Sequence, residues 1–91
     1  MTFRYNDKTL KAMESLLKDA GFVVRYEKGH FNSGYCLLES KRVVVINRYY
    51  TLESKINVLL DIIGQVDIDR EQLDEEAVAY LDFLLTQKQA S

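Results

Sequence analysis

The sequence predicts a single small α+β domain with the element order α-β-β-β-α-α. Apolar residues recur at helical spacing before residue 21 and again after residue 51, and three apolar runs of strand length lie between these segments. Brief polar connections separate the three runs. A chain of 91 residues cannot divide its apolar residues between two cores, so we expect one domain that covers residues 1–91.

The first helix is predicted over residues 8–20. Asp7 can act as its N-cap, and Leu10, Met13 and Leu17 fall on one stripe that would face the core. Gly21 supplies the left-handed residue with which many helices end. The pattern therefore gives both ends of this helix as well as its buried face.

Three strands are predicted at residues 22–27, 35–39 and 43–47. Residues 28–34 carry glycine at both ends of a bend and indicate a hairpin connection, while residues 40–42 form a tight polar turn. Connections this short favour a three-stranded antiparallel meander packed by helices. The third strand is apolar on both faces, so we expect both sides of the sheet to be covered at this strand.

The second helix is predicted to begin after Thr51, which can cap it, and its buried stripe includes Ile56, Leu59 and Ile63. Gly64 raises two alternatives. It either ends this helix or lies inside it, close to a packed neighbour, and both alternatives stay open at this point.

The third helix is predicted over roughly residues 70–88. Asp69 and Gln72 have the spacing of a capping box at its start. Acidic residues crowd its N-terminal half, where the helix dipole favours negative charge. These acidic residues lack the glycine and the terminal glutamate of a calcium-binding loop, so we expect a solvated helix start.

Composition excludes several classes of protein. The net charge of −2, from 12 basic and 14 acidic residues, gives no overall attraction to nucleic acid or anionic lipid, although it leaves room for a local basic patch. The single cysteine, Cys36, excludes an internal disulfide and suits a reducing compartment. The apolar run at residues 43–46 is far shorter than a membrane span, and the first residues do not resemble a signal peptide. We therefore expect a cytoplasmic protein without a membrane partner.

Catalytic groups are scarce. His30 is the single histidine, and it lies six residues from Cys36 across the predicted hairpin. These two could form a Cys–His pair or two metal ligands, but a structural zinc site needs four ligands of these types. A solvated loop histidine and a small apolar strand residue explain the pair more simply. We expect no catalytic residue, no metal and no cofactor.

A basic and aromatic group of residues offers a candidate interaction surface. Tyr49 and Tyr50 follow the apolar third strand, next to Arg48, with Arg42 and Lys41 nearby in sequence. Such residues can stack single-stranded nucleic acid, and tyrosine and arginine are also enriched in protein interfaces. A third interpretation is that the tyrosines anchor the corner between the strand and the second helix.

Residues 33–66 contain Ser33-Gly34, a short strand, a basic turn, a strand that ends in Asn47 and a spacer into an apolar helix. This layout resembles the core of the ImmA/IrrE-type zinc metallopeptidases. In that family the helix carries the metal-binding motif H-E-x-x-H. The corresponding segment here is Asp61-Ile62-Ile63-Gly64-Gln65.

The resemblance implies a catalytically inactive relative. Asp61 and Gln65 stand where the two histidines belong, and Ile62 stands where the glutamate that activates water belongs. Gly64 matches a glycine common in the family's helix. The segment from Arg25 to Cys36 also resembles small uncharacterised bacterial proteins.

Three functional hypotheses follow. The first is a non-catalytic protein-interaction or assembly module that self-associates, as a dimer, because a small core gains buried area by association. The second is a nucleic-acid-binding or regulatory protein that uses a basic and aromatic surface. The third is a degenerate metallopeptidase-like domain that retains metal or ligand binding around His30, Cys36 and Asp61.

Overall fold

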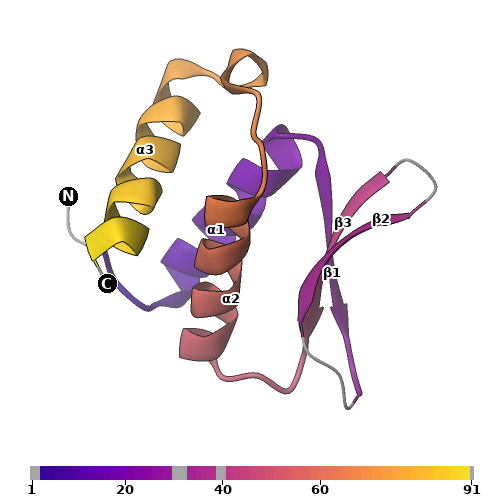
Figure 1. The fold of residues 1–91 in the computed structure, drawn as a ribbon. Helices are drawn as coiled ribbons and strands as arrows, with labels where there is room; N and C mark the ends of the chain where they lie inside the picture. Colours follow the sequence, from indigo (N-terminus) through magenta and orange to yellow (C-terminus); the bar gives the residue numbers. More distant parts are fainter. Residues whose placement is uncertain (1–2, 30–32, 39–40, 91) are drawn as a thin grey trace.

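The predicted α+β class is confirmed by the computed structural model, which describes residues 3–29, 33–38 and 41–90. Helices and strands occur in the predicted order, with one additional short 3-10 helix before the last α-helix (Figure 1). The elements, in chain order, are α1 (Asp7–Asp19), β1 (Phe22–Glu27), β2 (Gly34–Leu38), β3 (Lys41–Asn47), α2 (Leu52–Gln65), η1 (Arg70–Gln72) and α3 (Glu75–Ala90).

The sheet is mixed, so the predicted antiparallel meander is wrong. The strand order is β1-β3-β2, with β3 parallel to β1 and antiparallel to β2. In this arrangement Val44 of β3 pairs with Val24 on one side and with Tyr35 on the other. The connection over residues 28–33 can span roughly 20 Å, and two strand spacings need only about 10 Å. This connection is therefore long enough to place β2 two strand positions away from β1. The most apolar strand, β3, then occupies the central position of the sheet.

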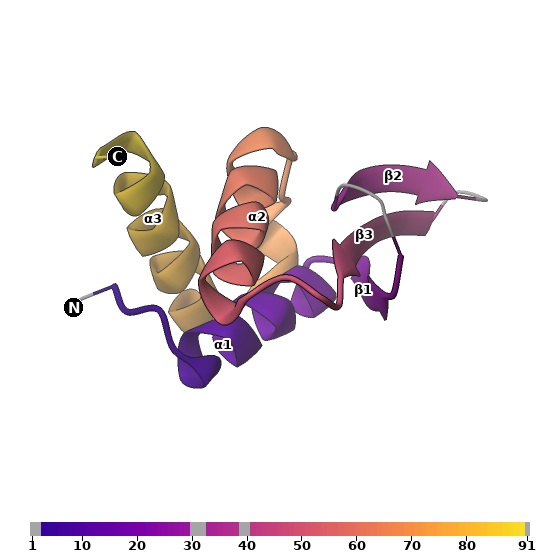
Figure 2. The same cartoon turned by 90° about the horizontal axis from the view of Figure 1, so that it is seen from below.

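All three helices lie on the same side of the sheet, with α1 and α2 next to the strands and α3 beyond α2 (Figures 1 and 2). Helix α1 packs against β1 and α2, and α2 packs against β2, β3 and α3. The core forms between the helices and the two strands β1 and β3, because α1, β1, β3, α2 and α3 contribute apolar side chains to one cluster. Its fully buried members include Leu17, Ile46, Ile56 and Leu84. The third strand led us to expect cover on both sides of the sheet. Val43 and Val44, neighbours in β3 whose side chains point to opposite faces, are 4% and 0% exposed, and the described helices lie on only one side.

Helix α1 begins one residue earlier than predicted. Its N-cap is Asn6, whose Oδ1 accepts a hydrogen bond from the N–H of Thr9 at 2.9 Å, and Asp7 is the first helical residue. Both residue types cap well, so local sequence does not separate the two positions. At the other end the prediction is confirmed, because Gly21 follows the helix with a φ of +90°.

Helix α2 begins where it was predicted. Thr51 caps it, and its Oγ1 accepts a hydrogen bond from the N–H of Ser54 at 3.2 Å. Gly64 lies inside the last turn of this helix, which decides between the two alternatives. Across the residues that the structure describes, no helix combines the length and apolarity that crossing a membrane requires.

The single helix predicted from residue 70 is wrong at its start. Asp69 caps the short helix η1 through the N–H of Glu71, and Asp74 then caps α3 through the N–H of Ala77 at 2.8 Å. Two aspartates five residues apart each bind a backbone N–H, and this competes with continuous helix between them. The proposed capping box at Asp69 and Gln72 is therefore replaced by two separate caps.

Candidate functional site

The predicted interaction residues do not form one patch. Arg42 lies near the start of β3, whereas Arg48, Tyr49 and Tyr50 follow its end, and the length of the strand separates them by roughly 20 Å. Arg42 also has partners within the chain. Its guanidinium lies 4.0 Å from the centre of the Phe22 ring and donates a 2.6 Å hydrogen bond to a backbone carbonyl, that of Asp67.

The corner after β3 is built around Asn47, a buried side chain that sequence reasoning missed as a structural centre. Its Nδ2 donates to the carbonyl of Gly29 at 2.8 Å, and its Oδ1 accepts from the N–H of Tyr49 at 3.0 Å. The Tyr49 side chain itself is 69% exposed. Asn47 therefore fixes the backbone of the corner and leaves the Tyr49 ring accessible.

The three residues proposed for ligand binding are only partly placed. His30 lies outside the residues that the structure describes. Cys36 lies in β2, paired in register with Val43, and Asp61 is exposed on α2. In residues 3–29, 33–38 and 41–90, no group of three or more His, Cys, Asp or Glu side chains is arranged to hold a metal ion.

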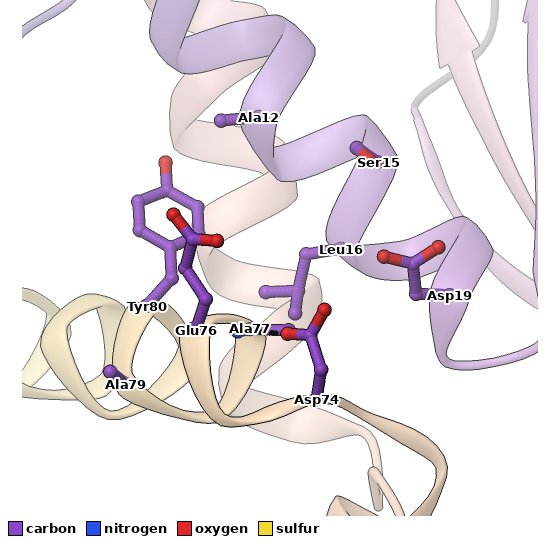
Figure 3. A pocket seen from close by; sticks show the side chains of 9 residues that line it. All are labelled: Ala12, Ser15, Leu16, Asp19, Asp74, Glu76, Ala77, Ala79 and Tyr80. Carbon is purple, nitrogen blue, oxygen red and sulfur yellow. Dashed lines mark hydrogen bonds between the residues drawn. The ribbon is translucent and has the colours of Figure 1, made fainter.

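A groove of about 440 Å³ lies between α1 and the start of α3 (Figure 3). The groove is open because several of its lining side chains are small, and three carboxylates, those of Asp19, Asp74 and Glu76, surround it. Burial raises the pKa of the Tyr80 phenol, so this group stays protonated near neutral pH. The groove is lined by Ala12, Ser15, Leu16, Asp19, Asp74, Glu76, Ala77, Ala79 and Tyr80. The groove depends on the packing of two distant helices, so the sequence pattern did not indicate it.

A second cleft, of about 390 Å³, lies between the first half of α1 and the ends of β1 and β3, and it includes Tyr26, Arg48 and Lys55. The hydroxyl of Tyr26 donates to Oε2 of Glu14, and Nζ of Lys55 lies 5.4 Å from the centre of the Tyr26 ring. Burial, and then the hydrogen bond and charge of Glu14, raise the pKa of Tyr26 above its ordinary value. A phenol held protonated in this way acts as a hydrogen-bond donor here, not as a base.

The two edges of the sheet differ in charge. At the β1 edge, Arg25 and Glu27 form a 2.9 Å ion pair, and both side chains are about half exposed. The β2 edge has no charged residue and no proline within residues 34–38. Tyr35 of β2 is 42% exposed, and its ring centre lies 5.7 Å from that of Phe22. Charged edge strands resist pairing with other strands, whereas uncharged ones favour it.

The fold and these surfaces define a small α+β domain that has helices on one face of a mixed sheet and an uncharged strand at one edge. Comparison with family models, with curated proteins and with solved structures finds no match to this chain.

Proposed function

We propose that this chain is a non-catalytic protein-interaction module that self-associates through the β2 edge of its sheet. The observation that carries the proposal is the position of β2. It is an outer strand of the sheet, it contains no charge and no proline, and Tyr35 is 42% exposed on it. The free backbone groups of such a strand can bind another strand.

The charge and size of the chain support association between copies. A net charge of −2 produces little repulsion between two identical chains. A domain of this size also buries a small fraction of its surface, so an added interface contributes a large share of its total stability. Both features favour a second copy over a highly charged partner.

The placement of Arg25, Arg42 and Arg48 supports protein over nucleic acid as the partner. Arg25 is paired with Glu27, and Arg42 is engaged by Phe22 and by a backbone carbonyl. Arg48 lies at the far end of β3 from Arg42. Nucleic-acid grooves gather several free cations along one track, and these arginines are divided between separate places.

The helix that resembles a metallopeptidase helix also supports a non-catalytic role. Ile62, which stands where the glutamate belongs, is 5% exposed and belongs to the core. Asp61 and Gln65, which stand where the histidines belong, are exposed. An isoleucine in the core can neither accept a proton nor activate water.

Size-exclusion chromatography with light scattering tests this proposal with two matched variants. Tyr35→Lys places a charge on the β2 edge, and Tyr49→Lys places the same charge on an exposed tyrosine away from that edge. We expect the wild type and Tyr49→Lys to have a dimer mass at high micromolar concentration and Tyr35→Lys to have the monomer mass. Thermal unfolding of each variant confirms that it is folded.

Two results would contradict the proposal. One is a wild-type chain that keeps the monomer mass at every concentration. The other is a dimer that Tyr49→Lys dissociates and Tyr35→Lys does not, because this pattern would place the interface at the corner after β3.

A further inference from the structure

We propose that two copies of this chain join by antiparallel pairing of β2 with the second copy's β2, with the two-fold axis at Cys36. This inference rests on the proposed function and specifies its partner and its register. The two sheets then form one continuous sheet, with three strands from each copy.

The outer side of β2 is open in the described structure. Strand β2 pairs with β3 along its inner side, from Gly34 with Val45 to Leu38 with Lys41. No other described element lies beyond it in the two views of the fold (Figures 1 and 2). In a strand, every second residue directs its N–H and C=O away from the neighbouring strand, so this side of β2 offers unused hydrogen-bonding groups.

The charges of the two edge strands favour β2 over β1 for self-pairing. The two antiparallel registers that overlap β1 most fully place Val24 or Arg25 on the axis. In the first register each Arg25 lies opposite an uncharged Val23. In the second register each Arg25 lies opposite the Arg25 of the other copy. The residues of β2 are uncharged, so its self-pairing places no charged side chain in the new strand pair, whereas both registers of β1 place Arg25 there.

The register follows from the length of β2. In an antiparallel pair, two residues that lie opposite each other both direct their backbone N–H and C=O toward the other strand, or both direct them away from it. A two-fold axis between two copies of one strand must therefore pass at a residue and not between two residues. An axis at Cys36, the middle of Gly34–Leu38, pairs the whole strand with its copy. An axis at Tyr35 or Leu37 leaves two residues of each strand unpaired. Cys36 is therefore the register with the most hydrogen bonds.

This register brings the one cysteine of the chain opposite its own copy. Residues directly opposite in an antiparallel pair have Cα atoms about 4.5–5.5 Å apart. Disulfides need a Cα separation of about 4.4–6.8 Å. A disulfide between the two Cys36 residues therefore tests the proposed axis in the wild-type chain, without any substitution.

Oxidation of the wild-type chain is the first test. Incubation with oxidised glutathione exchanges its disulfide for one between two Cys36 thiols and releases two glutathione thiols. We expect most of the protein to become a covalent dimer on a non-reducing gel, and dithiothreitol to reverse it. Cys36→Ser should retain the dimer mass in solution but form no covalent dimer.

Two cysteine variants in a Cys36→Ser background test the strand direction. Gly34 faces Leu38 of the second copy in the proposed register, so Gly34→Cys and Leu38→Cys chains should cross-link several-fold more when mixed than when separate. A Cβ at Gly34 has no atom within 4 Å, so this change fits the fold. Cross-linking of each variant with itself would indicate parallel pairing and overturn the inference.

The outcomes separate this inference from the proposed function. A dimer mass in solution with only glutathione-modified monomers after oxidation would overturn the Cys36 register and leave self-association intact. A monomer mass at every concentration would overturn both. A covalent wild-type dimer together with the mixed Gly34→Cys and Leu38→Cys product supports both.

Discussion

The backbone N–H of Asn47 donates a 2.8 Å hydrogen bond to the hydroxyl of Ser33. This bond joins the end of β3 to the residue that precedes β2, and the Asn47 side chain extends the link to the carbonyl of Gly29. The strand order β1-β3-β2 places β3 between the two ends of the connection over residues 28–33. Asn47 therefore binds the end of β3 to Gly29 and Ser33, one on each side of residues 30–32.

Substitution Asn47→Ala should destabilise the fold by about 2–3 kcal/mol, because it leaves the Gly29 carbonyl and the Tyr49 N–H without this partner. Urea unfolding measures the loss. Asn57→Ala is the matched control, since Asn57 is exposed and accepts a hydrogen bond from the Tyr5 hydroxyl at the surface. Its cost should stay below about 1 kcal/mol, and equal costs for the two variants would contradict the role given to Asn47.

Gly21→Ala should destabilise the chain by about 1 kcal/mol or more, because Gly21 has a φ of +90° that an alanine adopts with strain. The comparison is Gly34→Ala. Gly34 has no positive φ, and a Cβ there has no atom within 4 Å. Thermal unfolding in the Tyr35→Lys background, in which we expect a monomer, separates the two effects from association. A larger loss at Gly34 than at Gly21 would be inconsistent with the described backbone.

The two caps before α3 predict an asymmetry. Asp74→Ala should cost about 1 kcal/mol, because it removes the cap of the long helix Glu75–Ala90, while Asp69→Ala should cost less because it uncaps only η1. Denaturant unfolding of the two variants compares them. A larger cost at Asp69 would indicate that α3 begins near residue 70 after all.

The raised pKa of Tyr26 predicts how stability depends on alkaline pH. Ordinary tyrosine loses its proton near pH 10, and in the folded chain burial and Glu14 hold the proton more tightly. The contribution of Tyr26 is therefore complete below about pH 10 and falls as the pH rises above it, since the unfolded chain loses the proton first. Tyr26→Phe should show a smaller loss of stability as the pH rises above about pH 10, measured by unfolding at each pH. An unchanged slope would contradict this account.

The sequence predicts those parts of the fold that local chemistry decides. The Thr51 cap and the Gly21 stop depend on one or two neighbouring residues, and both are confirmed. Asn6 and Asp7 are adjacent and chemically similar caps, so the start of α1 was predicted one residue late.

The remaining errors have a non-local origin. The strand order depends on whether the chain pairs β2 directly with β1 or leaves a position for β3 between them. The short connections favoured a meander, although the apolar residues on both faces of β3 fit a central strand. The bonds of Asn47 and the groove at Tyr80 join residues far apart in sequence, so no periodic pattern indicates them. Arg42 and Arg48 were grouped by sequence distance, and the length of β3 separates them.

Sedimentation velocity of the wild-type chain over a wide concentration range tests the central claim most directly. Self-association through β2 predicts a sedimentation coefficient that rises with concentration from the monomer value toward the dimer value, and no such rise for Tyr35→Lys. A coefficient that keeps the monomer value from low micromolar to high micromolar concentration would contradict it.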